Sequence, residues 1–372
     1  MNETQRNLIY LLSCAANGIT PDKEKVQGMD PEKLHRLAVF HSVSGAVCIA
    51  LQMAGVENGQ FIGSYKKAVR RNVYLDIERA AILADLEQQG IWYMPLKGAV
   101  LKDLYPQNGM REMADNDILY DAGKSTQVRE IMLSQGYTVK KFGRWHHDVY
   151  EKPPVLNMEM HTGFFSEKSS DLLSIYYSDV RRFLRKDDGN RFGYHFSDED
   201  FYVYMTAHEW NHYRKNGTGI RSLMDCFVYC KVKGNSLDWE YIEEQCRQLG
   251  TADFERERRS LAGKVFSAES LPALNAAETE MLTQYLAAGT YGKIENELDQ
   301  KLKNQSKAGY LLSGIIPDME YMKHSVPFVR RYPLLYPAGI VYRWGRIFLH
   351  QRKDLIITAK AVIRHDRKQQ TK

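Results

Sequence analysis

The stretch that decides the fold runs from Ile91 to His161 and holds three patterned segments. The first reads Ile91-Trp-Tyr-Met-Pro-Leu-Lys-Gly-Ala-Val-Leu101, and the second reads Arg111-Glu-Met-Ala-Asp-Asn-Asp-Ile-Leu-Tyr120. The third reads Val155-Leu-Asn-Met-Glu-Met-His161. Short apolar runs bounded by polar residues indicate strands, and the run after Lys-Gly has helical character. The order predicts a strand, a glycine turn, a helix and two acid-bearing strands in one small unit.

Two acidic residues stand at the start of the second strand. Asp115 and Asp117 flank Asn116, and the apolar residues Ile118 to Tyr120 follow. Because side chains alternate along a strand, both carboxylates are expected on one face and Asn116 on the other. Neighbouring carboxylates repel unless a hard divalent cation neutralises them. The pattern therefore predicts a Mg²⁺ site, with Mn²⁺ as an alternative ion.

Glu159 would complete this site from the third segment. A third carboxylate on an adjacent strand would allow two ions about 4 Å apart to act on an in-line phosphoryl displacement. Lys97 and Gly98 stand at the preceding turn, where glycine allows backbone to approach a phosphate and a helix N-terminus attracts anions. Each feature alone is common in structural roles, since an isolated Asp-x-Asp is usually a solvated turn. Their order favours a phosphoryl-transfer site.

A family resemblance rests on Leu96-Lys97-Gly98, Leu101, Tyr105, Arg111 and Asp115-x-Asp117-Ile-Leu. These residues resemble the uncharacterised bacterial nucleotidyltransferase-like family of the DNA polymerase β superfamily. The resemblance implies an α+β fold, with a small mixed sheet embedded in a mainly helical chain. It also implies transfer of a nucleoside monophosphate from a nucleoside triphosphate, such as ATP, to a hydroxyl acceptor with magnesium.

Carried over by position, Asp115 and Asp117 match the paired metal ligands of that family, and Glu159 matches the third carboxylate. Gly98 matches the phosphate-facing turn, although Ala99 stands where the wider superfamily has serine. Lys97 is expected to face the triphosphate. Arg111 is expected to offset the charge of the triphosphate, with an exposed loop charge as its alternative role.

A second motif lies further along the chain, where His208-Glu209-Trp-Asn-His212 matches the H-E-x-x-H pattern of zinc peptidases. On a helix the two histidines share a face, so a zinc metallohydrolase with Glu209 as its base is the alternative function. The alternative we favour for His208 and His212 is a helix face lining the nucleotide pocket. A third hypothesis is a catalytically silent nucleotide-binding protein on the same fold.

Other polar residues are expected to have supporting roles. His146, His147 and His161 suggest zinc, but adjacent strand residues face opposite sides, so we predict substrate-lining or structural roles for them. Arg221 and Asp225 are spaced for an ion pair within one helix.

The rest of the chain predicts helices around this core. With 372 residues, 44% hydrophobic and 26% charged, the chain is globular and long enough for more than one domain. We predict a helical region over residues 1–90, the nucleotidyltransferase core over 91–165 and a second helical region over 166–322. A long helix is expected over residues 65–89. Its predicted inward residues are Val69, Val73, Ile77, Ala80, Leu83 and Leu86.

Cysteine usage and hydropathy indicate the compartment. The five cysteines are scattered without a CxxC pair, which fits a reducing cytoplasm. The N-terminus lacks the basic start and apolar core of a signal peptide, and no apolar run is long enough to span a bilayer.

The last segment, residues 323–372, differs in charge from the rest. It contains twelve Lys or Arg and two Asp, whereas the whole chain has a net charge of +5. Aromatic residues alternate with the basic ones. Such a segment fits contact with nucleic acid or with an anionic membrane surface. The alternative is a C-terminal helix that packs its aromatic residues on the body and leaves its charges in water.

Overall fold

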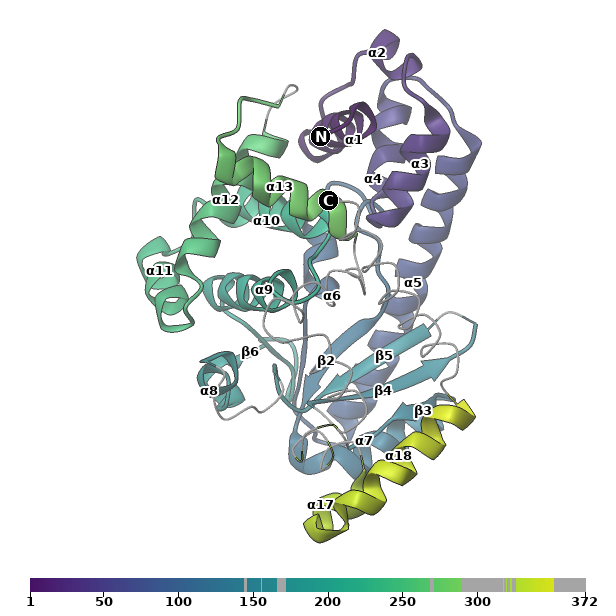
Figure 1. Cartoon of the computed structure of the whole chain (residues 1–372), viewed down its shortest axis with the longest axis vertical. Coiled ribbons are helices and arrows are strands. Elements are labelled where there is room, and N and C mark those ends of the chain that lie inside the picture. Colours follow the sequence, from purple (N-terminus) through teal and green to yellow (C-terminus); the bar gives the residue numbers. More distant parts are fainter. Residues whose placement is uncertain are drawn as a thin grey trace. The chain divides into compact units, whose positions relative to one another are not determined.

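The computed structural model describes residues 1–143, 146–154, 156–165, 172–267, 271–289, 317, 319, 322 and 326–350. It contains two compact units (Figure 1). The first comprises Met1–Asn211 and Thr218–Thr290, and the second comprises His212–Gly217 and Tyr291–Lys372. The domain boundaries predicted at residues 91, 166 and 323 remain predictions.

A five-stranded mixed sheet forms the centre of the first unit, in the order β1-β2-β5-β4-β3. In chain order its strands are β1 (Tyr93–Pro95), β2 (Asn116–Tyr120), β3 (Thr138–Lys141), β4 (His147–Lys152) and β5 (Leu156–His161). The β2–β5 pair is parallel and the other three pairs are antiparallel. A separate two-stranded ribbon joins β6 (Arg185–Lys186) to β7 (Tyr194–His195). The predicted α+β class with a small mixed sheet is confirmed.

Helices connect the strands and form a core with one face of the sheet. They are α5 (Gly59–Gln88) before β1, α6 (Gly98–Leu101) and the 3₁₀ turn η1 (Lys102–Leu104) after it, and η2 (Ala122–Lys124) and α7 (Ser125–Ser134) after β2. Leu86 of α5 and Met132 of α7 are buried in one cluster with Ile118 and Tyr120 of β2. Parallel strands need a crossover connection, and α7 followed by the β3–β4 hairpin joins β2 to β5.

The phase of α5 differs from the prediction. Val73 and Ile77 were expected to face inward, but they are 41% and 59% exposed. The buried positions include Asn72, Leu75 and Ile82. The apolar pattern misled the phase because polar residues of α5 occupy its inward face, where they bond to the segment around β2.

The remaining helices of the first unit lie before α5 and after β5. The N-terminal group is α1 (Glu3–Asn17), α2 (Lys23–Gln27), α3 (Pro31–Phe40) and α4 (Ser44–Met53). The later group is α8 (Leu172–Tyr176), η3 (Val180–Phe183), α9 (Asp198–Tyr213), α10 (Ile220–Lys233), α11 (Trp239–Gln248), α12 (Ala252–Phe266) and α13 (Ala276–Ala288).

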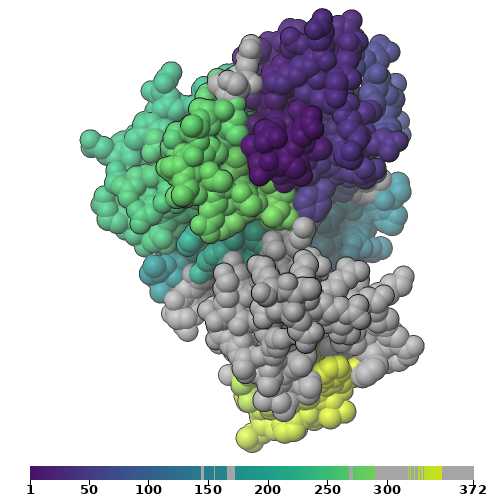
Figure 2. Space-filling view, turned by 45° about the horizontal axis from the view of Figure 1, so that its top comes forward, coloured from purple at the N-terminus to yellow at the C-terminus, as the bar shows by residue number. Residues whose placement is uncertain are grey.

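The two helical groups meet although they are far apart in sequence. Figure 2 shows the purple N-terminal helices beside the green segment of α12 and α13. The hydroxyl of Ser13 on α1 donates to the carbonyl of Phe266 at 2.8 Å, and Lys231 Nζ on α10 donates to the carbonyl of Ala16 at 2.9 Å. Through these contacts α1 caps the later helices, so both groups belong to one folded body.

The described part of the second unit contains α17 (Pro327–Arg331), η4 (Pro333–Leu335) and α18 (Tyr336–His350). Met322, Val326 and Val329 form a small buried cluster there, against which Phe328, Tyr336 and Ile340 pack. Residues 323–325 and 351–372 of the predicted basic segment lie outside the described residues. Within the described residues, no helix combines the length and hydropathy needed to cross a membrane.

Candidate active site

The parallel pairing of β2 with β5 brings the predicted acidic residues together. Asp117 is the register partner of Glu159, and Asp115 precedes it by two residues. Asn116 points the opposite way, because its Nδ2 donates to the carbonyl of Leu75 on α5 at 2.8 Å. Asn116 and Asp117 therefore alternate as predicted, whereas Asp115 lies before the first residue of β2.

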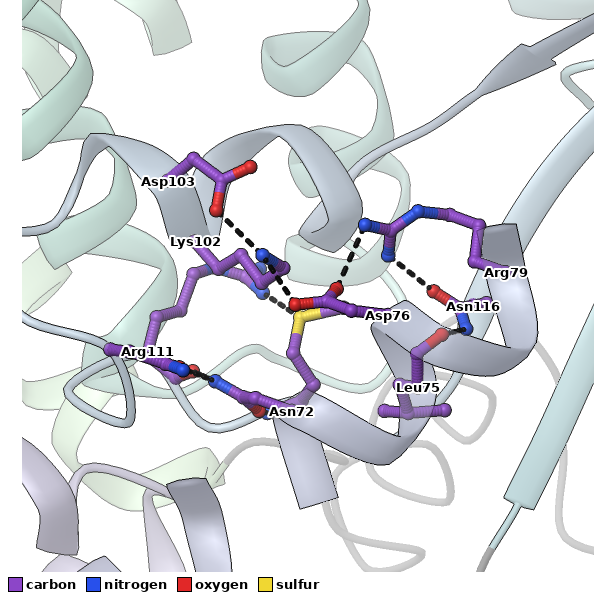
Figure 3. Close-up of polar contacts among 10 residues, drawn as sticks. Asn72, Leu75, Asp76, Arg79, Lys102, Asp103, Arg111 and Asn116 are labelled. Atoms are coloured by element: carbon purple, nitrogen blue, oxygen red, sulfur yellow. Dashed lines mark hydrogen bonds and ion pairs between the residues drawn. The ribbon is translucent and has the colours of Figure 1, made fainter. Parts of the chain in front are cut away.

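Helix α5 fixes the start of β2 through polar side chains (Figure 3). Arg79 Nη1 donates to Asn116 Oδ1 at 2.9 Å, and its Nη2 pairs with Asp76 Oδ1 at 2.8 Å. The second oxygen of Asp76 lies 3.1 Å from Lys102 Nζ at the end of the turn after β1. Asn72 donates to the carbonyl of Arg111 at 3.1 Å. This network holds the segment carrying Asp115 and Asp117 against α5.

Lys97 stands at the turn between β1 and α6 and has a positive φ of 47°. A non-glycine residue in this region is strained and persists only when its surroundings hold it. Here the amide of Leu96 donates to the carbonyl of Asp117 at 2.9 Å, and the amide of Leu101 donates to the carbonyl of Lys97 at 3.0 Å. The turn directs Lys97 Nζ to Asp117 Oδ1, 2.8 Å away.

His161, for which we predicted only a substrate-lining or structural role, lies against the carboxylates. Its Nε2 lies 2.8 Å from Asp117 Oδ1 and 3.7 Å from Glu159 Oε2. His147 Nε2 lies 3.8 Å from the same oxygen of Glu159. The signal for His161 was available, since it follows Glu159 by two residues on one strand and so shares its face.

The carboxylates repel one another in a buried setting. Burial, followed by the charge of Asp117 and then of Asp115, raises the pKa of Glu159 to about 7. Burial and Asp117 also raise the pKa of Asp115. Burial opposes ionisation of Asp117 as well, but Lys97 and then His161 outweigh it and hold the pKa of that carboxyl well below its usual range. Lys97 and His161 therefore compensate the charge of Asp117, whereas the negative charges of Asp115 and Glu159 are not fully compensated.

Asp117, Glu159 and His161 can hold a metal ion, since one ligand atom from each lies within 4.8 Å of the others. Asp115 acts on this group through its charge, because it contributes to the raised pKa of Glu159. Carboxylate oxygens suit hard divalent cations, and a cation would relieve the repulsion between the acids. The donor set therefore fits the predicted magnesium ion, with an imidazole beside it.

Three histidines gather next to these acids. The ring centroids of His146, His147 and His161 are separated by 4.6, 5.1 and 5.7 Å. The prediction that His146 and His147 face opposite sides is wrong, because His146 lies before the first residue of β4. Its carbonyl accepts from the amide of Thr162 at 2.8 Å and from the Thr162 hydroxyl at 3.2 Å, which ties it to the end of β5.

Arg111 does not face the carboxylates. It is 7% exposed, and its guanidinium makes two bonds to Asp225 on α10, at 2.8 and 3.0 Å. Tyr105 donates to Asp225 Oδ1 at 2.7 Å. Arg221 Nη1 donates to the carbonyl of Glu112 at 3.0 Å, and its pair with Asp225 remains a prediction. Arg111 thus joins the core to α10, which is neither the nucleotide contact nor the exposed charge considered from the sequence.

Gly98 serves the same junction. A Cβ at this position would lie 2.7 Å from Arg111 Nη1 and 2.7 Å from Met113 Sδ. A larger residue here would therefore force these side chains to shift. This requirement is independent of the predicted approach to a phosphate.

The H-E-x-x-H motif lies on α9, where Glu209 is 5% exposed. Its Oε2 accepts from Arg258 Nη1 at 2.8 Å and its Oε1 accepts from the Tyr285 hydroxyl at 2.6 Å. A buried carboxylate with both oxygens bonded is not available as the base of a zinc peptidase. His208 is half-buried with its ring 6.1 Å from that of Tyr204, and His212 belongs to the second unit.

A sheet with acidic residues on two adjacent parallel strands, preceded by a lysine-glycine turn, is the arrangement expected of a nucleotidyl-transfer domain. Residues 27–267 match the family model described as an uncharacterised nucleotidyltransferase, and the chain belongs to this family. The match includes the whole five-stranded sheet. No curated protein and no solved structure matches the chain.

Proposed function

We propose that this protein transfers a nucleoside monophosphate from a nucleoside triphosphate to a hydroxyl group of an acceptor, as a member of the DNA polymerase β superfamily. The acceptor oxygen attacks the α-phosphorus, a new O–P bond forms, and the bond to the leaving pyrophosphate breaks. The single observation that supports this most directly is the register of β2 and β5, in which Asp117 lies opposite Glu159.

Asp115, Asp117 and Glu159 would hold two magnesium ions, with manganese as a substitute. The bound ions would neutralise the developing charge of the phosphoryl group and lower the pKa of the attacking hydroxyl. Glu159 would complete the metal site from β5 and orient or deprotonate the attacking hydroxyl.

Lys97 is the residue we propose for contact with the triphosphate. Its ammonium lies 2.8 Å from Asp117 Oδ1, and burial of that pair keeps both groups close to the reacting atoms. Gly98 opens the helix that follows, and we retain it with His208 as a nucleotide-binding residue, whereas His212 belongs to the second unit and is not assigned to this site. Arg111 is excluded from this set because its guanidinium is bonded to Asp225 inside the fold.

Partners and compartment follow from composition. The basic segment over residues 323–372 would bring an anionic partner, either nucleic acid or a membrane surface, to the chain. The cysteines form no disulfide among the described residues, which is compatible with the reducing cytoplasm that we propose for the protein.

The proposal is tested with Asp115→Asn, Asp117→Asn and Glu159→Gln. We expect all three to lose magnesium-dependent binding of a non-hydrolysable triphosphate, measured by calorimetry, while circular dichroism stays unchanged. Glu151→Gln is the matched control, since Glu151 lies on the adjacent strand β4 and pairs with the exposed Lys140 instead. Equal triphosphate affinity in wild type and all three variants would refute the site.

One observation favours a second candidate, a nucleotide-binding protein without transfer activity. Lys97 and His161 both contact Asp117, so part of its charge is already neutralised without a metal. Pyrophosphate release separates the two functions. The assay supplies each of the four ribonucleoside triphosphates together with a cell extract that has been depleted of other nucleotidyltransferases and serves as the source of acceptors. A transferase should release pyrophosphate from at least one of the four, whereas a silent protein should bind a triphosphate and release none.

A further inference from the structure

The three histidines beside the acids form a cluster that the proposed transfer reaction does not use. His146 and His147 stand at the start of β4, and His161 stands at the end of β5, its antiparallel neighbour. One ring nitrogen from each residue lies within 4.8 Å of the others. The three imidazoles come from adjacent strands whose register is fixed by the sheet.

We propose that His146, His147 and His161 bind a divalent transition-metal ion of the zinc type, at a site adjoining the carboxylates that would hold magnesium. Imidazole nitrogen is a preferred ligand of zinc, nickel and copper, whereas magnesium prefers oxygen. A three-histidine set with an open fourth position is also an established coordination for zinc in proteins.

The separation of two of the nitrogens fits an ion. His147 Nδ1 lies 3.3 Å from His146 Nε2. Two nitrogen ligands of a tetrahedral zinc ion, each about 2.0–2.1 Å from the metal, are about 3.3 Å apart. A ring nitrogen of His161 lies within 4.8 Å of one from each of these two residues, so the third imidazole would have to move closer to complete the set.

The outer contact of His161 matches that of a metal-bound histidine. A histidine that binds a metal through one nitrogen usually directs the other at a carboxylate. His161 Nε2 faces Asp117 Oδ1 at 2.8 Å, whereas His147 Nε2 lies 3.8 Å from Glu159 Oε2, beyond hydrogen-bond distance. Asp117 thus serves as the outer partner of His161.

His161 has a second ring nitrogen, Nδ1, beside the backbone of Gly163. The residue is 1% exposed, and its Nδ1 is buried without a well-formed hydrogen bond among the described residues, although the backbone of Gly163 lies close to the ring. A buried polar atom without a good partner is costly. An ion among the three rings would supply that partner.

The neighbouring acids also suit a bound cation. Asp117 lies 2.8 Å from His161 Nε2, and Glu159 lies 3.7 Å from the same nitrogen, so both provide negative charge beside the three rings.

The test is zinc binding to the full-length protein in the presence of excess magnesium, measured by calorimetry and by metal analysis after dialysis. We expect one zinc ion per chain in the wild type. The double variant His146→Asn/His147→Asn should bind zinc at least about tenfold more weakly, since two ligands are lost. His195→Asn is the matched control, because that histidine is exposed and pairs with Asp187.

Two further measurements keep the outcome decisive. Asp115→Asn should retain zinc while losing magnesium-dependent triphosphate binding, so the zinc site and the proposed transfer site can fail separately. A zinc-soaked crystal should give an anomalous difference peak among the three rings. Wild type without stoichiometric zinc, a double variant that binds zinc as tightly as wild type, or a peak at the carboxylates alone would each overturn the proposal.

Discussion

Asp117 is the carboxylate on which the charges of the site converge. It accepts from Lys97 Nζ and from His161 Nε2 at the same oxygen, each at 2.8 Å. A metal ion that binds Asp117 must compete with the lysine, whereas a phosphate group would attract the same ammonium. Lys97 is therefore expected to oppose metal binding and to favour nucleotide binding.

Lys97→Met separates these two effects. Magnesium should bind the variant several-fold more tightly in the absence of nucleotide, because a neighbouring charge worth about 1–4 kcal/mol near a protein surface is removed. A triphosphate should bind it several-fold more weakly. Calorimetry with each ligand measures both, and Lys102→Met is the control, since its ammonium pairs with Asp76 and Asp103. A change of the same sign for both ligands would contradict this role.

Gly98→Ala tests the junction behind the turn. Its Cβ would lie 2.7 Å from side-chain atoms of Arg111 and Met113, so we expect a loss of about 1–3 kcal/mol in the free energy of unfolding. Gly263→Ala is the matched control on α12, where an added Cβ meets nothing within 4 Å. That change should stabilise the protein by about 0.4–1 kcal/mol. Urea unfolding measures both, and equal stability of the two variants would show that the space around Gly98 is not tight.

Cysteine reactivity should follow burial and local hydrogen bonds. The hydrogen bond with Cys226, followed by the charge of Arg258, lowers the pKa of the Cys230 thiol to about 7, whereas burial raises the pKa of Cys48 and of Cys246 to about 11. A lowered pKa means more thiolate at a given pH, and thiolate is the reactive form. At pH 8, iodoacetamide should therefore modify Cys230 before Cys48 and Cys246, as followed by peptide mass spectrometry. Simultaneous modification of all three would contradict the expectation.

Local periodicity predicts which side chains share a face, and it does not predict distant partners. Asp117 and Glu159 could be paired from the alternation of two neighbouring strands. The bonds between Arg111 and Asp225 join residues 114 positions apart, and nothing near either residue indicates the other. His146 was misjudged for a different reason, since the first residue of β4 decides whether alternation applies to it.

Among the secondary-structure elements, the strands were easier to place than the phase of the long helix. The turn at Lys97 and the two acid-bearing strands follow from short sequence patterns. Helix α5 has apolar residues on more than one side, and its inward face includes the polar residues Asn72 and Arg79. Their partners belong to the loop before β2 and to β2 itself, so the helix alone could not show which side is buried.

The phase of α5 has a direct mutational test. Leu75 is fully buried, and Leu75→Ala should cost about 2–5 kcal/mol of unfolding free energy through lost burial and a cavity. Val73 on the same helix is 41% exposed, so Val73→Ala should change stability by no more than about 0.5 kcal/mol. Denaturant midpoints of both variants decide the matter. The opposite ranking would restore the phase predicted from apolar spacing.

For the molecule as a whole, the family resemblance implied the fold class and composition predicted the charge distribution, but neither could predict which helices meet. The hydrogen bond between Ser13 on α1 and the carbonyl of Phe266 at the end of α12 joins residues that are 253 positions apart. Nothing in either segment alone indicates that the two helices meet. Charge is different, because it is additive along the chain. A segment with twelve basic and two acidic residues keeps that balance whatever its fold.

This charge predicts salt-dependent binding of the full-length protein to single-stranded RNA. Affinity for a single strand falls with salt by a slope of about 0.7 for each phosphate neutralised, so removing basic contacts should flatten the dependence. The test variant replaces four basic residues with glutamine: Arg352, Lys353, Arg367 and Lys368. The control replaces four exposed basic residues of the first unit: Lys23, Lys33, Arg36 and Arg256.

Fluorescence anisotropy over a range of salt concentrations measures both slopes. We expect the test variant to have a slope lower by up to about 3, and the control to match the wild type. Vesicles containing anionic lipid, measured in parallel, distinguish the other partner. Salt-dependent binding to vesicles without binding to RNA would assign the basic segment to a membrane surface, because the electrostatic attraction is shared while the stacking of bases on aromatic side chains is not.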